Sequence, residues 1–144
     1  MTESKNKPAK SFWIIGITAL IWNLMGVFAY LQRAYMTAED LAALPIEEQA
    51  LYDNVPIWVT AAFALAVFGG TLGCILLLLR KKLATFIFSI SLANILAQMT
   101  YNIFMSKALE VYGPGGIIMP IMVIIIGAFL VWYSKKMDQQ GFLS

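Results

Sequence analysis

Four long apolar runs dominate the chain, and each is long enough to cross a lipid bilayer. They cover residues 12–31, 57–79, 83–105 and 117–133, with polar segments between them. About 20 apolar residues in an α-helix span the hydrocarbon core of a bilayer. The pattern therefore predicts an all-α polytopic membrane protein, an antiparallel bundle of four transmembrane helices that forms a single domain over residues 1–144.

The polar segments carry the signals for turns and short helices. Pro56 stands at the start of the second run, where a first-turn proline loses no hydrogen bond, and a Gly-Pro-Gly-Gly turn at 113–116 precedes the fourth run. In the loop over residues 33–55, Thr37 and Asp40 have the spacing of a capping box, and Pro45 can end one helical turn and begin another. We expect two short helical turns there.

Composition places the chain in a lipid rather than an aqueous environment. Hydrophobic residues make up 60% of the sequence and charged residues 12%, whereas soluble domains contain about a quarter charged residues. Four spans use most of the 144 residues and leave no room for a soluble catalytic domain. The formal net charge of +2 is small, so no nucleic-acid partner is indicated.

The distribution of basic residues predicts the orientation. Eight of the ten Lys and Arg residues lie in the two tails and in the turn between the second and third runs: Lys5, Lys7, Lys10, Arg80, Lys81, Lys82, Lys135 and Lys136. Only Arg33 and Lys107 fall on the other side. Because cytoplasmic segments are enriched in Lys and Arg, we expect both termini inside and the 33–55 loop outside. Arg33 could receive an anion there, although snorkelling of its long side chain is the simpler interpretation.

A cleaved signal peptide is the rival interpretation of the first run. Val27-Phe28-Ala29 offers small residues at the positions that precede a cleavage site. The apolar part of a signal peptide is about 7–15 residues long, and the run over 12–31 exceeds that length. A membrane-spanning first helix is therefore favoured.

Small and polar residues gather on one face of each of the first two helices. At 100° per residue, the first helix has an arc of about 80° that contains Gly16, Ala19, Asn23, Gly26 and Tyr30. The second has an arc of about 100° that contains Ala62, Ala66, Gly69, Gly70 and Gly73. Gly69 and Gly73 have the spacing that lets two helix backbones approach closely. We expect both faces to look into the bundle, with self-association as a further use of the second.

The third helix carries a polar stripe, formed by Ser91, Asn94, Gln98 and Asn102 within an arc of about 80°. Unpaired amides cost several kcal/mol in the hydrocarbon layer, so the stripe should avoid lipid. Hydrogen bonding between helices is one explanation, and the lining of a site or path for a small neutral polar solute is the other. Asn23 and Asn94 lie near the middle of their spans, which predicts a direct or water-bridged contact.

The sequence offers little material for catalysis. Histidine is absent and Cys74 is the one cysteine, which excludes disulfides within the chain, His/Cys metal sites and Cys/His nucleophile pairs. We therefore expect no enzymatic activity, no cofactor and no metal. The central layers of the spans contain no Asp, Glu, Lys or Arg, which argues against ion-driven pumping.

The stretch from Pro56 to Cys74, followed by Arg80-Lys81-Lys82, resembles a group of small uncharacterised bacterial inner-membrane proteins. Some of these carry an automatically assigned "sugar transporter" label. The resemblance extends over the whole chain, including Leu44-Pro45 and Leu51-Tyr52 in the loop. It implies a multi-pass protein of the bacterial inner (cytoplasmic) membrane and brings no catalytic or binding residues with it.

Two functional hypotheses follow from these patterns. The first is a non-enzymatic membrane protein whose amide-lined interior binds or passes a small neutral polar, sugar-like solute, as a homo-oligomer because four helices enclose little space. The second is an accessory or scaffold protein that assembles with other membrane proteins. It would do so through the small-residue face of the second helix and through the 33–55 loop, which carries the acids Glu39, Asp40, Glu47, Glu48 and Asp53.

Overall fold

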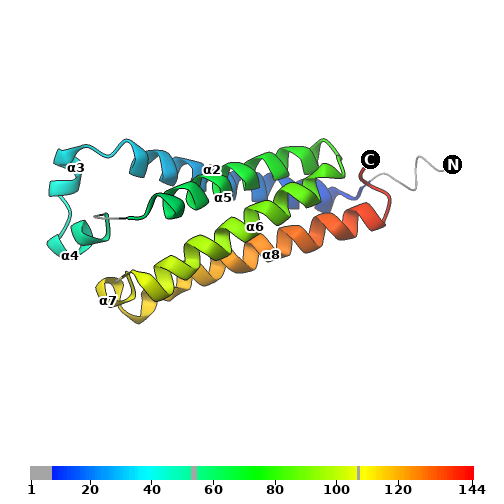
Figure 1. Cartoon of the computed structure of the whole chain (residues 1–144). Helices are drawn as coiled ribbons and strands as arrows, with labels where there is room; N and C mark the ends of the chain where they lie inside the picture. The colour runs from blue at the N-terminus through cyan, green and yellow to red at the C-terminus, as the bar shows by residue number, and fades with distance from the viewer. Residues whose placement is uncertain (1–7, 53–54, 107) are drawn as a thin grey trace.

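The computed structural model describes residues 8–52, 55–106 and 108–144, and these residues form helices and contain no β-strand. The four long helices are α2 (Lys10–Ala34), α5 (Ile57–Leu78), α6 (Leu83–Thr100) and α8 (Ile118–Gln139) (Figure 1). All four coincide with segments long and apolar enough to span a bilayer. The prediction of an all-α protein with four helices of membrane-spanning length is therefore confirmed.

The fourth helix is longer than the sequence predicted. The predicted span ended at residue 133, where polar residues begin, whereas α8 continues to Gln139. The added residues include Lys135, Lys136 and Gln139, which are good helix formers in water. Polarity therefore marks where the apolar segment ends, and the helix itself continues beyond that point.

The segment between α2 and α5 contains the short helices α3 (Ala38–Ala42), α4 (Ile46–Gln49) and η1 (Ala50–Tyr52). Thr37 and Asp40 form the predicted capping box: the Asp40 amide donates to Thr37 Oγ1 over 3.1 Å, and the Thr37 amide donates to Asp40 Oδ2 over 3.2 Å. Pro45 precedes α4 directly. The two predicted helical turns are therefore confirmed.

A π-helical turn, η2 (Tyr101–Met105), continues α6. It is followed by α7 (Ala108–Tyr112) and by the 3₁₀ turn η3 (Pro114–Ile117), which leads into α8. Gly113 has φ of 75°, a backbone conformation that glycine adopts without steric cost. These short elements lie at the same end of the bundle as α3 and α4, which we call the loop end (Figure 1).

The four long helices pack in the order α2, α5, α6, α8, and α2 and α8 are not packed against each other along their lengths. They approach at the end opposite the loops, where the rings of Phe12 and Tyr133 stack with centroids 6.4 Å apart. We call this the turn end, because it holds the turn between α5 and α6. Figure 1 shows the α2–α5 pair diverging from the α6–α8 pair toward the loop end.

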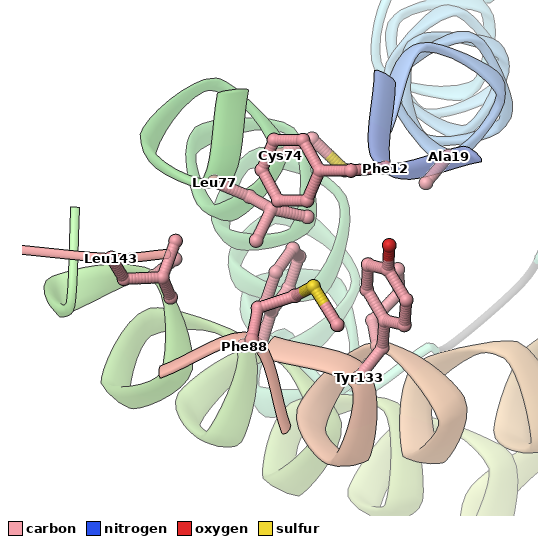
Figure 2. Close-up of a cluster of buried hydrophobic side chains, with 10 residues drawn as sticks. Phe12, Ala19, Cys74, Leu77, Phe88, Tyr133 and Leu143 are labelled. Atoms are coloured by element: carbon pink, nitrogen blue, oxygen red, sulfur yellow. The ribbon is translucent and has the colours of Figure 1, made fainter. Parts of the chain in front are cut away.

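A cluster of buried apolar side chains closes the turn end (Figure 2). Phe12, Leu77, Phe88 and Tyr133 come from the four long helices, and Leu143 joins them from the segment after α8. That segment is fastened to the α5–α6 turn, since the Ser144 amide donates to the Arg80 carbonyl over 2.9 Å and the Lys82 amide donates to the Ser144 carbonyl over 3.1 Å. Residues far apart in the sequence are therefore joined at this end.

Candidate functional site: a cavity between the four helices

The long helices enclose a cavity of about 370 Å³. Each of α2, α5, α6 and α8 contributes four or five lining residues, and Phe88 and Leu130 of the buried cluster line it toward the turn end. Pockets for small ligands have volumes of about 300–1,000 Å³. The cavity is therefore large enough for a small molecule.

The cavity walls are largely apolar. Among its described lining residues, only Asn23, Ser91, Gln98 and the indole of Trp22 carry a side-chain hydrogen-bonding group. Mostly apolar walls with a few polar groups are typical of small-molecule sites, in which the polar groups orient the ligand. The possible orienting groups are therefore few and can be considered one by one.

Gln98 is the amide of the cavity wall whose hydrogen-bonding groups are unused. Its side chain is 7% exposed and lines the cavity. Within the part of the chain that the structure describes, the Gln98 amide has no hydrogen-bond partner. Its polar atoms are not fully enclosed by protein, and the residue lines the cavity. The amide therefore presents two donors and an acceptor to whatever occupies the cavity.

Ser91 and Asn23 already have partners in the protein. Ser91 Oγ on α6 donates to the Ala66 carbonyl on α5 over 2.6 Å. Asn23 Nδ2 donates to the Ala19 carbonyl over 2.9 Å and lies 3.4 Å from the Cys74 sulfur. Ser91 thus joins α6 to α5, and Asn23 joins α2 to α5. Both donors are therefore engaged within the protein and are not available to a ligand.

Asn94 belongs to a different environment from Gln98, although both lie on the predicted stripe. Asn94 does not line the cavity, and its Nδ2 donates to the Ile90 carbonyl of its own helix over 2.9 Å. The expected direct contact between Asn23 and Asn94 is not formed, because α2 packs on α5 rather than on α6. The stripe is therefore divided between cavity and bundle surface.

The remaining predicted residues lie nearer the loop end. Asn102 belongs to the π-helical turn and lines a second cavity of about 480 Å³, which shares Met99 and Met119 with the first. Tyr30 lines a third cavity of about 490 Å³ and packs edge-on against Phe63, with ring centroids 5.4 Å apart. The predicted polar residues therefore do not form one continuous lining.

Arg33 and Tyr52 stand between the two loop-end cavities, since both residues line both of them. The Arg33 guanidinium lies over the Tyr52 ring, 4.9 Å from its centroid, in a cation–π contact. Nearby, desolvation raises the pKa of the Tyr112 phenol, and the charge of Glu48 raises it further. That phenol therefore stays protonated at neutral pH.

The predicted small-residue face of α5, which includes Gly69, Gly70 and Gly73, packs against neighbouring helices, and only part of it lines the cavity. A Cβ on Gly73 would lie 2.6 Å from the Phe88 ring, and Gly70 lies directly against the Asn23 amide. A Cβ on Gly69 would lie 3.4 Å from Ser91 Cβ, which is an ordinary contact. Ala62 and Ala66 are buried on the same helix. The close approach of α5 to α6 therefore depends on Gly73 more than on Gly69.

Sequence reasoning did not single out the methionines and the tryptophan that line the cavity. Trp22, Met25 and Met119 carry no motif, and an apolar residue on a predicted span gives no sign of whether it faces lipid or a cavity. The one available signal was the number of methionines, eight in the chain, because flexible thioethers suit adaptable binding surfaces. Among the described residues, no group of three His, Cys, Asp or Glu side chains is placed to hold a metal ion.

Comparison of the chain with protein-family models, with curated protein sequences and with solved structures gives no match.

Proposed function

We propose that this chain is a non-enzymatic integral membrane protein that binds a small neutral molecule in the cavity between α2, α5, α6 and α8. The observation that carries the proposal is Gln98, a side chain more than nine-tenths buried whose amide faces the cavity without a protein partner. An unpaired buried amide costs about 1–3 kcal/mol, and a bound hydrogen-bonding ligand would recover that cost.

The proposed setting is the bacterial inner membrane, with four antiparallel spans and both termini in the cytoplasm. Four helices of sufficient length and hydropathy support the membrane assignment. The orientation is supported by the basic residues, because Lys10, Arg80, Lys82 and Lys136 belong to segments at the turn end, whereas Arg33 is at the loop end. The resemblance to small bacterial inner-membrane proteins supports the choice of membrane.

The cavity fits a molecule with few polar groups better than a sugar. A sugar carries several hydroxyls, and each one buried without a partner costs about 1–3 kcal/mol. The cavity offers one free amide, because the Ser91 and Asn23 donors are engaged. We therefore propose a neutral ligand with an apolar body and one or two hydrogen-bonding groups.

Thermal denaturation of the purified protein tests the proposal. The probes are octan-1-ol and octanamide, with glucose as the polar comparison and octane as the apolar one. We expect the alcohol and the amide to raise the melting temperature of the wild type saturably, because a ligand that binds only the folded state stabilises it. Glucose and octane should raise it far less.

Two amides on one helix provide matched variants. Gln98→Leu removes the amide that faces the cavity, and Asn94→Leu removes one that bonds to its own helix. The Gln98 variant should lose most of the alcohol-induced stabilisation, and the Asn94 variant should keep it. If the wild type responds to none of the probes, or if both variants respond equally, the proposal is wrong, and an accessory role in membrane assemblies becomes the better hypothesis.

A further inference from the structure

The interhelical cavity has an opening on the side of the bundle. Met25 of α2 and Met119 of α8 both line the cavity, yet their side chains are 61% and 58% exposed. A side chain that is exposed and also lines a cavity stands at its mouth. Because α2 and α8 are not packed together along their lengths, the mouth lies between them.

The two methionines stand at the same level of the bundle. The stacked rings of Phe12 and Tyr133 bring α2 and α8 together at the turn end. Met25 follows Phe12 by 13 residues, and Met119 precedes Tyr133 by 14 residues. At 1.5 Å per residue, each lies about 20 Å from that contact. Two flexible thioethers therefore flank one opening, at the height where the helices have diverged.

The opening faces the surface that the bilayer covers. Other side chains of α2 and α8, including Ile21 and Ile125, are 55% and 60% exposed and apolar. Exposed apolar side chains on spanning helices contact lipid tails. A molecule with an apolar body concentrates in those tails, so it would meet the mouth from within the bilayer.

Resting on the proposed function, we infer that the ligand is a neutral single-chain amphiphile with one hydroxyl or amide end group, taken from the bilayer through the gap between Met25 and Met119. Its end group hydrogen-bonds to the Gln98 amide, and its chain lies along the apolar walls toward the mouth. Unbranched thioether side chains can change rotamer to admit a chain and close over it.

Trp22 gives a direct measurement, because it lines the cavity whereas Trp13, Trp58 and Trp132 do not. A variant with those three tryptophans changed to phenylalanine, in lipid nanodiscs, reports on the cavity alone. The probe is 11-bromoundecan-1-ol, whose bromine quenches indole fluorescence. We expect saturable quenching that unlabelled undecan-1-ol reverses and that Gln98→Leu abolishes.

The rate of quenching tests the route. Met25→Phe with Met119→Phe narrows the mouth, and we expect quenching to slow roughly tenfold at an unchanged plateau. Ile21→Phe with Ile125→Phe is the matched control, since both isoleucines are lipid-exposed on the same helices and neither lines the cavity. Met25→Ala with Met119→Ala widens the mouth and should increase the rate of quenching. This second pair of substitutions tests the route even if the phenylalanine variant folds poorly.

The possible outcomes separate the two claims. Quenching without saturation in the parent variant would overturn both the proposed binding site and this inference. Saturable quenching whose rate is the same in the narrowed, widened and control variants would overturn the lateral route and leave the binding site standing. Saturable quenching that is slowed by the narrowed mouth alone and speeded by the widened mouth supports both.

Discussion

The Ser91 hydroxyl on α6 donates a hydrogen bond to the backbone carbonyl of Ala66 on α5, over 2.6 Å. The bond joins the two helices at the cavity wall, one helical turn from Gly69. Because the Ser91 hydroxyl already donates this bond, it cannot donate to a ligand. Ser91 therefore has a structural role in the cavity wall, whereas the Gln98 amide, on the same stripe of α6, remains free to bind a ligand.

Removing the Ser91 hydroxyl should destabilise the protein slightly. Interhelical hydrogen bonds in membranes average about 0.6 kcal/mol and reach about 1.7 kcal/mol, so Ser91→Ala should cost an amount in that range. Ser89→Ala is the matched control, because Ser89 Oγ bonds to the Thr85 carbonyl of its own helix and is exposed. Unfolding in mixed detergent measures both. Equal losses in the two variants would contradict a role for Ser91 between helices.

Alanine substitutions at Gly69 and Gly73, the two closely spaced glycines of α5, should change the stability by different amounts. Gly73→Ala places a Cβ 2.6 Å from the Phe88 ring and should destabilise by about 1–3 kcal/mol, as overpacking does. Gly69→Ala places its Cβ at an ordinary contact distance of 3.4 Å and should be nearly neutral. The yield and melting temperature of the folded protein in detergent compare them. A larger loss of stability for Gly69→Ala than for Gly73→Ala would contradict the assignment of Gly73 to the close contact between α5 and α6.

Leu143 should matter for stability although it lies outside the spans. It is 4% exposed in the turn-end cluster, and Leu→Ala changes in a core cost about 2–5 kcal/mol. Leu79→Ala provides the comparison, because Leu79 is 62% exposed at the same end. We expect thermal unfolding to show a marked loss for Leu143→Ala and little change for Leu79→Ala. The reverse order would contradict the docking of the C-terminal segment on the α5–α6 turn.

The orientation can be tested by labelling in intact cells. Cysteines introduced at Ser4 and at Ser144 should resist a membrane-impermeant maleimide, and one at Glu47 should react, because the basic residues predict a cytoplasmic turn end. The native Cys74 is buried and gives little background. Labelling of a cysteine at position 4 or 144 from outside the cell would contradict the predicted orientation.

The lengths of the spans and the short helices of the loop were predictable from the sequence, because they depend on local patterns. Apolar runs determine where a helix can lie in a bilayer, and the Thr37–Asp40 capping box depends on residues three apart. The end of α8 was not predictable from hydropathy, because a helix continues into water when its residues, such as Lys135 and Lys136, favour it.

The division of the polar stripe was not predictable, because it depends on which helices are neighbours. Periodicity places Asn94 and Gln98 on one face of α6, one turn apart. Whether either side chain faces a cavity depends on where α2 and α8 lie, and α2 packs on α5. The cavity lies between two helix pairs that diverge, and no local pattern in either pair specifies that divergence.

The side-chain amide resonance of Gln98 is the most direct test of the central claim, that this free amide binds the ligand in the cavity. In protein labelled with ¹⁵N-glutamine in lipid nanodiscs, the Gln98 NH₂ signal should shift saturably as octan-1-ol is added. Gln49 is the internal control, because its Nε2 already donates to the Leu44 carbonyl over 2.7 Å, and its signal should stay in place. A Gln98 signal that does not move, or that drifts without saturation alongside that of Gln49, would contradict the account.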